Sequence, residues 1–242
     1  MLYHTLCEGL RVKGKKQKET NIITLAIEKG GVAKTTSVCN LAASYAQLGK
    51  RILVLDMDHQ GNSSDLLGVS ERALAENKHI SRAIKEKLPL EEVRLRGNIE
   101  GLDVIAADTS LKKLKGEKEG TALQHLLLKP LFDTPALSEY DIVLIDTHPS
   151  IDCLVLSALV ASHYYLIPSF AEASSIKGIA EMINFVSEIR DLNPMLMLLG
   201  VVIANFDKNI ATHVRFERVL RDFGEQANYR VFKTVIPHSA SV

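Results

Sequence analysis

Several features are absent or scarce in this 242-residue chain, and each absence excludes a class of protein. The chain has no tryptophan, only 5% aromatic residues, and 29 Lys and Arg that balance 29 Asp and Glu. Zero net charge removes the global basic field of many nucleic-acid-binding proteins, so any DNA contact must come from a local patch. No apolar run reaches the ~18–20 residues of a membrane span, so we expect a soluble protein without membrane contact.

Cysteine is also scarce. Cys7, Cys39 and Cys153 lie far apart, without the CxxC spacing of a metal or redox motif. An odd count fits a reducing compartment better than a disulfide scaffold, and the basic N-terminus lacks the apolar stretch of a signal peptide. We therefore expect a cytoplasmic protein.

Two parts of the chain differ in composition. Residues 1–20 are basic and hold little that could form a core, whereas residues 21–242 are long enough for one domain and are predicted to form it. The basic extension is either a solvated tail or a contact for nucleic acid or a partner.

Short apolar runs alternate with amphipathic segments from residue 22 onward. Most runs lack polar alternation, which is typical of strands buried on both faces of a parallel sheet. We predict strands at residues 22–27, 52–55, 102–106, 142–145, 164–167, 198–203 and 231–236, and helices at residues 35–48, 81–84, 111–128, 175–192 and 212–223. The fold class is therefore α/β: a doubly wound, mostly parallel sheet of about seven strands with helices on both faces. Ligands in this architecture bind beyond the carboxyl ends of the strands.

The strongest motif follows the first predicted strand and opens the first predicted helix. It reads Lys29-Gly30-Gly31-Val32-Ala33-Lys34-Thr35-Thr36. Glycines let successive backbone N–H groups point at phosphate oxygens, and the helix N-terminus adds its positive dipole end. Lys34 is expected to reach the β- and γ-phosphates and Thr35 to hold Mg²⁺, so the motif predicts a P-loop. Ala33 stands where the plain P-loop pattern has glycine.

The order Lys-Gly-Gly-x-x-Lys-Thr-Thr resembles the deviant Walker A motif of the ParA/MinD class of P-loop ATPases. In that class the early lysine, Lys29 here, reaches across a dimer interface to the partner subunit's nucleotide. The resemblance thus implies ATP and Mg²⁺ as cofactors and a homodimer closed on two ATP molecules. A solvated surface lysine is the alternative for Lys29.

Two further segments carry the same resemblance. Asp56-Met57-Asp58-His59-Gln60-Gly61-Asn62 is similar to the family's second-strand motif, usually Asp-x-Asp-Pro-Gln-Gly-Asn. The resemblance assigns Asp58 to the attacking water, together with Lys29 and Lys34 as catalytic groups, and Asp56 to the magnesium shell or the loop. Asp146 ends an apolar run as a Walker B aspartate does, and is expected to bind Mg²⁺ through water.

Histidine replaces proline at two places in these motifs. His59 follows Asp58, and His148 follows the pair Asp146-Thr147, where the family usually has proline. Each histidine either tunes the neighbouring carboxylate or responds to pH, or is a tolerated, partly exposed substitution.

The resemblance extends from about residue 21 to the C-terminus. By position, Asn205 and the Pro237 loop are expected near the adenine. The family continues past the Ile-Pro segment into a further loop and a terminal helix, whereas this chain stops at Val242, so we expect it to lack that C-terminal end.

A possible DNA contact lies on the last predicted helix. Its apolar residues Phe216, Val219, Leu220 and Phe223 share one face, and Arg215, Arg218 and Arg221 project from the other. Arginines in this pattern can track phosphates without reading sequence, with Lys233 as a further contact. The alternative is an ordinary solvated helix face.

Together these features predict a ParA-like ATPase for plasmid or chromosome partitioning. The resemblance implies an ATP-dependent dimer that binds DNA nonspecifically, associates with the nucleoid, and is stimulated by a ParB-type partner. Two alternatives remain open: a MinD-like membrane-cycling ATPase, which needs an amphipathic membrane helix, and a nucleotide-binding scaffold with little turnover.

Overall fold

A computed structural model describes residues 20–121 and 124–238. Its strands are β1 (Asn21–Leu25), β2 (Ile52–Met57), β3 (Leu95–Arg96), β4 (Leu102–Ile105), β5 (Ile142–Thr147), β6 (Tyr164–Phe170) and β7 (Met197–Ala204). Its α-helices are α2 (Lys34–Gln47), α3 (Asn62–Leu66), α4 (Ser70–Glu76), α5 (Ile80–Glu86), α6 (Leu90–Val93), α7 (Ser110–Lys118), α8 (Lys129–Phe132), α9 (Cys153–Val160), α10 (Ala173–Glu188) and α11 (Ala211–Gln226). Apart from Thr20, the predicted basic extension lies outside the described residues.

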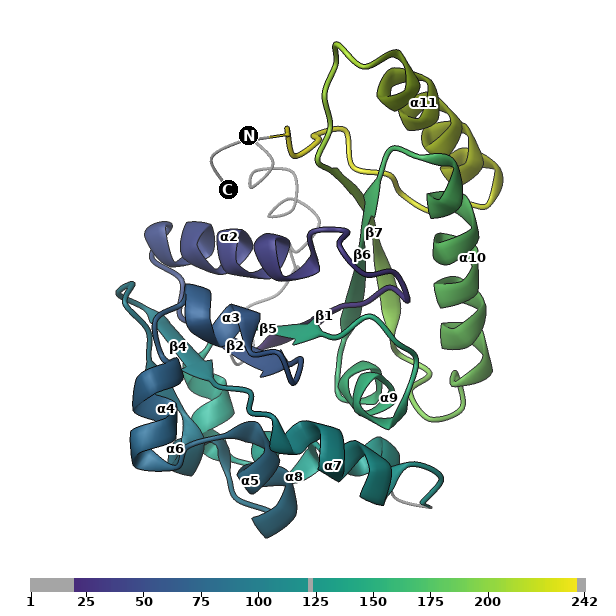
Figure 1. The fold of residues 1–242 in the computed structure, drawn as a ribbon. Helices are drawn as coiled ribbons and strands as arrows, with labels where there is room; N and C mark the ends of the chain where they lie inside the picture. The colour runs from purple at the N-terminus through teal and green to yellow at the C-terminus, as the bar shows by residue number, and fades with distance from the viewer. Residues whose placement is uncertain (1–19, 122–123, 239–242) are drawn as a thin grey trace, which may run out of the picture.

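The strands form one seven-stranded sheet in the order β3-β4-β2-β5-β1-β6-β7. All neighbouring pairs are parallel except β3 with β4. Helices lie on both sides of the sheet, with α2 above it and α7, α8 and α9 below it in Figure 1. The predicted fold class is confirmed.

Alternate residues of the central strands pack into two separate cores. In β2, Ile52 and Val54 pack on the α2 side, whereas Leu53 and Leu55 pack against α5 to α9 on the other side. A third core joins β6 and β7 to α10 and α11. Because both faces of these strands are buried, the sequence shows continuous apolar runs instead of alternation.

The predicted strand at residues 231–236 is wrong. This segment runs along the edge of β7 but makes only isolated bridges, Val201 with Val231 and Phe206 with Pro237. The seventh strand is β3, which the sequence analysis missed. Two residues are too short to show any periodicity, so β3 left no signal in the sequence.

One predicted helix is shorter than expected, and other helices were not predicted. The helix expected over residues 111–128 ends at Lys118, ahead of Gly120, and a 3₁₀ turn follows at Gln124–Leu126. The sequence analysis missed the short helices α3, α4, α6 and α8 and also α9, whose residues are apolar apart from Ser157 and therefore lack helical periodicity. Its local signal is Asp152, whose carboxylate caps the helix by accepting from the Leu154 and Val155 N–H groups.

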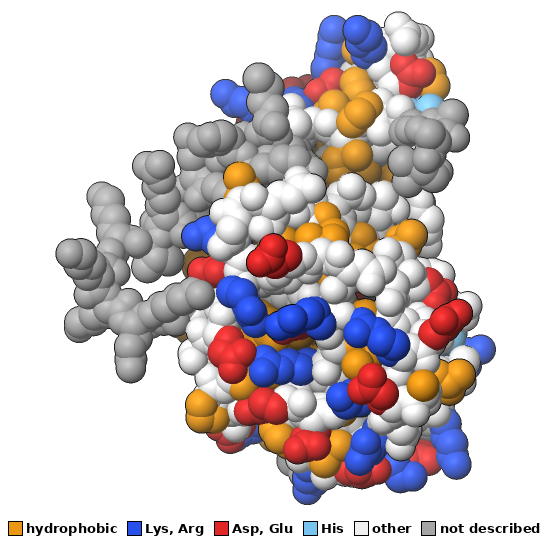
Figure 2. All heavy atoms as spheres, turned by 90° about the vertical axis from the view of Figure 1, so that its left-hand side faces the viewer, with side chains coloured by type: hydrophobic (Ala, Val, Ile, Leu, Met, Phe, Trp, Pro, Cys, Tyr) orange, Lys and Arg blue, Asp and Glu red, His pale blue; other side chains and the backbone are white. Residues whose placement is uncertain are grey.

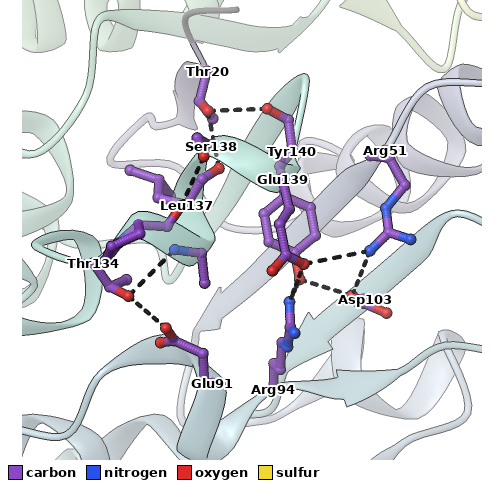
Figure 3. Close-up of polar contacts among 12 residues, drawn as sticks. Thr20, Arg51, Glu91, Arg94, Asp103, Thr134, Leu137, Ser138, Glu139 and Tyr140 are labelled. Atoms are coloured by element: carbon purple, nitrogen blue, oxygen red, sulfur yellow. Dashed lines mark hydrogen bonds and ion pairs between the residues drawn. The ribbon is translucent and has the colours of Figure 1, made fainter.

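At the amino ends of the strands, a polar cluster surrounds the buried Tyr140 (Figure 3). The Tyr140 hydroxyl donates to Asp103 Oδ2 at 2.7 Å and accepts from Arg94 Nη1 at 3.0 Å. Arg94 also pairs with Glu139 at 2.7 Å, and Arg51 lies 3.5 Å from Asp103. These contacts join the starts of β2, β4 and β5.

Candidate nucleotide-binding site

The predicted P-loop lies between β1 and α2, at the carboxyl end of the sheet (Figure 1). Gly31 and Ala33 adopt left-handed conformations, with φ of 70° and 62°. The Ala33 carbonyl accepts the first helical hydrogen bond, from Ser37 N at 2.9 Å. Ala33 therefore adopts the left-handed conformation that the plain P-loop pattern gives to glycine. Its Cβ makes this conformation more costly for alanine than for glycine.

Lys34 is folded into this loop. Its ammonium donates to the carbonyl oxygens of Lys29 at 2.8 Å and Ile27 at 3.3 Å, and the residue is only 7% exposed. Burial lowers the pKa of Lys34 to about 8, while the nearby carboxylates of Asp146 and Asp58 oppose the shift. A buried cation among carbonyl groups is placed to neutralise phosphate charge.

Lys29 is held within its own chain. Its ammonium forms an ion pair with Glu172 and a 2.6 Å hydrogen bond to Ser174 Oγ, both from the start of α10. The sequence analysis gave Glu172 no role. A pairing across 143 positions leaves no local pattern that could have revealed it.

Thr35 and Asp146 come together as a candidate metal site. Burial raises the pKa of Asp146, opposed by hydroxyls of Ser63 and Thr35 that face the same carboxylate. Ser63 Oγ donates to Asp146 Oδ2 at 2.5 Å, whereas Asp146 Oδ1 is buried without a hydrogen-bond partner in the described structure. One carboxylate and one hydroxyl suit Mg²⁺, which takes oxygen ligands and keeps several waters.

The described residues contain no cluster of three His, Cys, Asp or Glu side chains able to hold a metal ion. A site for Mg²⁺ does not require one, because substrate phosphates and water supply the remaining ligands. The donor set at Thr35 and Asp146 therefore fits the metal that the motif implies.

Asp56 lies beside Asp146 in the register of β2 and β5. Its carboxylate accepts from Ser64 N at 2.9 Å, Ser64 Oγ at 2.7 Å and Asp58 N at 3.1 Å. Burial, reinforced by the Asp146 charge, raises the pKa of Asp56 to about 7 against these hydrogen bonds. Of its two predicted roles, these contacts favour support of the loop over direct metal contact. Ser63 and Ser64, which the sequence analysis missed, attach α3 to the two buried aspartates.

Asp58 lines the pocket at the carboxyl end of the sheet. Its Oδ1 accepts from Gln60 N at 3.0 Å and lies 3.5 Å from His59 Nδ1. The same pocket, of about 840 Å³, is lined by residues 30–37 of the P-loop and helix start and by Asn205 and Pro237 at a more apolar end. The structure thus brings the predicted phosphate, water and adenine residues into one cavity.

The two residues predicted near the adenine are also connected by the backbone. Phe206 N donates to Ile236 O at 3.0 Å, which fixes the Pro237 loop beside Asn205. Asn205 Oδ1 lies 2.6 Å from His238 Nδ1. Their common place in the pocket is consistent with a base-binding role, which stays a prediction.

The arginines of α11 differ from one another. Arg221 donates to Glu217 at 2.7 Å and to the carbonyl oxygens of Phe232 and Lys233, each at 3.1 Å, so it attaches the C-terminal segment to the helix. Arg215, Arg218 and Lys233 are exposed. On the predicted apolar face, Phe216 and Leu220 pack into the third core and Val219 is half-buried, but Phe223 is 39% exposed.

Comparisons with known proteins show the family of this chain. A family profile described as an AAA domain matches residues 20–198. The chain is 37% identical to the chromosome-partitioning ATPase Soj of Thermus thermophilus, over 90% of this chain and 81% of Soj. The chain belongs to the ParA family. The resemblance read from the sequence is thereby confirmed.

Two further relatives extend the comparison of this ParA-family chain. It is 32% identical to an uncharacterized protein of Mycobacterium tuberculosis, over 89% of this chain but only 66% of that protein's length. The structure of a cobyrinic acid a,c-diamide synthase from Mycobacterium smegmatis, with bound ADP and magnesium, is similar at a TM-score of 0.81. It is 27% identical and the match covers 91% of this chain and 88% of that one. Among the described residues of the ParA-family chain, no helix is long and apolar enough to cross a membrane.

Proposed function

We propose that this chain binds and hydrolyses ATP·Mg²⁺ to drive DNA partitioning. The observation that carries the proposal is one pocket lined by the Lys34 loop, by Asp58 and by Thr35, whose hydroxyl faces the buried Asp146 carboxylate. Binding of an adenine nucleotide with magnesium is supported by the ADP and magnesium bound in the similar synthase structure. Membership of the ParA family supplies the biological context.

The roles of the residues follow from their positions. Lys34 neutralises phosphate charge from its buried place in the loop, and backbone N–H groups of the loop bind phosphate oxygens. Thr35 and Asp146 hold the metal, directly and through water. Asp58, which lines the same pocket, orients the attacking water. When bound, ATP·Mg²⁺ supplies the transferable phosphoryl group and the cation that spreads its charge.

Lys29 completes the site only in a dimer. In the single chain its ammonium is engaged by Glu172 and Ser174, so delivery to a partner's nucleotide requires that these contacts open. A cation brought to the transition state from a second subunit acts as an arginine finger does. Lys29→Ala is therefore expected to bind ATP as a monomer but to lose the ATP-dependent dimer, measured by light scattering after size exclusion.

DNA binding is assigned to the α11 end of the molecule. In the lower part of the face shown in Figure 2, Asp and Glu side chains border the Lys and Arg side chains, which does not favour a phosphate-tracking surface there. On α11, Arg215 and Arg218 remain exposed, and Lys233 lies on the adjoining segment. A dimer doubles these contacts, so ATP-gated dimerisation raises DNA affinity through effective concentration.

The decisive experiment is a gel-shift titration with unrelated DNA, in ATP and in ADP, alongside ATP hydrolysis with and without a ParB-type partner. We expect DNA binding in ATP only, lost in Arg215→Glu/Arg218→Glu, and hydrolysis that the partner stimulates. DNA binding that is equal in ATP and ADP would contradict the gating. ATP binding with no turnover and no DNA affinity would favour the scaffold alternative.

A further inference from the structure

The two histidines that replace family prolines meet beside Asp58. The rings of His59 and His148 pack edge to face, with centroids 6.2 Å apart and planes at 69°. His59 Nδ1 lies 3.5 Å from Asp58 Oδ1, and its Nε2 is 2.8 Å from Gln60 Nε2. The loops after β2 and β5 are therefore in contact through these two side chains.

His148 is held in place by Asp152 and Ser150. Its Nε2 lies 2.5 Å from Asp152 Oδ2 and 2.7 Å from Ser150 Oγ, and its side chain is 7% exposed. The other carboxylate oxygen of Asp152 caps α9 by accepting from Leu154 N at 2.9 Å and Val155 N at 3.2 Å. A buried carboxylate held by a helix N-terminus is a rigid support for an imidazole.

Lys115 of α7 closes the set of contacts. Its ammonium lies 2.7 Å from Asp152 Oδ2, the same oxygen that holds His148. The Lys115 side chain is 38% exposed and the Asp152 side chain is 5% exposed, so Lys115 is the member of this pair that reaches the solvent. Contacts thus continue from the surface of α7 through Asp152 and the histidine pair to Asp58.

We propose that Lys115 is a positioning residue for Asp58, acting through Asp152, His148 and His59. The proposal rests on the proposed function, in which Asp58 orients the attacking water. In the family, a proline ring restricts the backbone of each of the two loops. Here hydrogen bonds and the contact between the two histidine rings take this role, and the stiffness of the loops depends on the contacts of Asp152 with His148 and Lys115. Because a displacement of about 1 Å can cost roughly a hundredfold in rate, loosening this anchor lowers turnover without removing any group that binds nucleotide.

The main test compares two lysines of the same helix. Lys115→Met is expected to lower kcat for ATP about fivefold or more with KM within twofold, whereas Lys113→Met, at an exposed position of α7, leaves both unchanged. Lys115→Arg keeps the ion pair and is expected to restore kcat to within twofold of wild type. The effects of Lys115→Met and His59→Ala are expected to be non-additive, because both act on Asp58.

A second readout does not depend on hydrolysis. In nucleotide-free protein the amides of Gln60 and Gly61 donate to Asp58 Oδ1 and Asp58 O, so their hydrogen exchange reports on this loop. Exchange there is expected to accelerate at least threefold in Lys115→Met and not in Lys113→Met, at equal melting temperature.

Unchanged exchange in Lys115→Met, or equal kcat in the two methionine variants, overturns the proposal. A fall in kcat that is matched by an equal rise in KM also overturns it, because it would place the effect on nucleotide binding. If the wild-type protein does not hydrolyse ATP, the proposed function fails and the exchange comparison alone decides whether Lys115 positions Asp58.

Discussion

Lys29 and Glu172, 143 positions apart in the chain, form an ion pair that holds the early P-loop lysine on its own subunit. Ser174 Oγ accepts a second hydrogen bond from the same ammonium. If Lys29 acts on a partner's nucleotide, Glu172 competes with that nucleotide for the Lys29 ammonium. The pair is partly exposed, at 29% for Lys29 and 44% for Glu172, so the competition is modest.

Glu172→Gln is therefore expected to tighten the ATP-dependent dimer by about two- to fivefold, the range of a partly exposed ion pair. Sedimentation velocity with a hydrolysis-deficient background measures the dimer dissociation constant. Glu181→Gln is the matched control, because it removes the more exposed Lys177–Glu181 pair of the same helix. A dimer that Glu172→Gln weakens would show that Glu172 supports the interface instead.

Lys34→Ala is expected to weaken ATP binding by at least about tenfold to a hundredfold, the worth of a charge-assisted hydrogen bond in a buried site. Isothermal titration calorimetry measures the affinity. Lys50→Ala, at an exposed position after the end of α2, serves as the control. Unchanged affinity in Lys34→Ala would remove the P-loop assignment.

Asp58→Ala is expected to retain ATP affinity and to lose hydrolysis by roughly a hundredfold or more, as removal of a water-orienting group does. A coupled phosphate-release assay measures turnover. Asp65→Ala, at an exposed position of α3, controls for changes near the loop. Wild-type turnover in Asp58→Ala would assign the water to another group.

Ala33→Gly is expected to stabilise the protein by about 0.5–1 kcal/mol, because Ala33 has a φ of 62° and glycine relieves that strain. Urea unfolding followed by circular dichroism measures the difference. Ala43→Gly, inside α2, is expected to have the opposite sign, a loss of about 1 kcal/mol. Losses at both positions would mean that the Ala33 backbone carries no strain.

Asp56 predicts a pH dependence of stability. Its folded-state pKa of about 7 lies above the unfolded value of about 4, so the folded state binds its proton more tightly. The stabilisation is fully present below about pH 4 and is lost as pH rises through about 7. Asp56→Asn should thus gain stability relative to wild type as pH rises from about 4 to about 7, in unfolding experiments with EDTA.

Asp65→Asn is the control for this comparison, since Asp65 is exposed on α3, and its difference from wild type should stay constant across the same pH range. A constant difference for Asp56→Asn as well would show that Asp56 ionises normally in the folded protein.

The sequence predicted the parts of the site that are continuous in the chain. Strand, glycine turn, lysine and helix coincide over residues 22–48, and the structure has the predicted loop between β1 and α2. This local combination could not reveal Ser63 on Asp146 or Glu172 on Lys29, because these contacts join residues 83 and 143 positions apart. The strand prediction at residues 231–236 was wrong for a related reason. The apolar residues of this segment suit a strand, but in the folded protein the segment forms only isolated bridges.

The polar cluster around Tyr140 lies at the amino ends of the strands, whereas the P-loop, Asp58 and Asp146 lie at the carboxyl ends. The contacts that join the strands around Tyr140 and the proposed site thus lie at opposite ends of the same strands. Arg51, Arg94 and Asp103 do not line the pocket, so substitutions there can be tested for their effect on stability without altering the residues of the proposed site. Variants at the amino ends of the strands can therefore be screened for stability while the residues of the pocket stay unchanged.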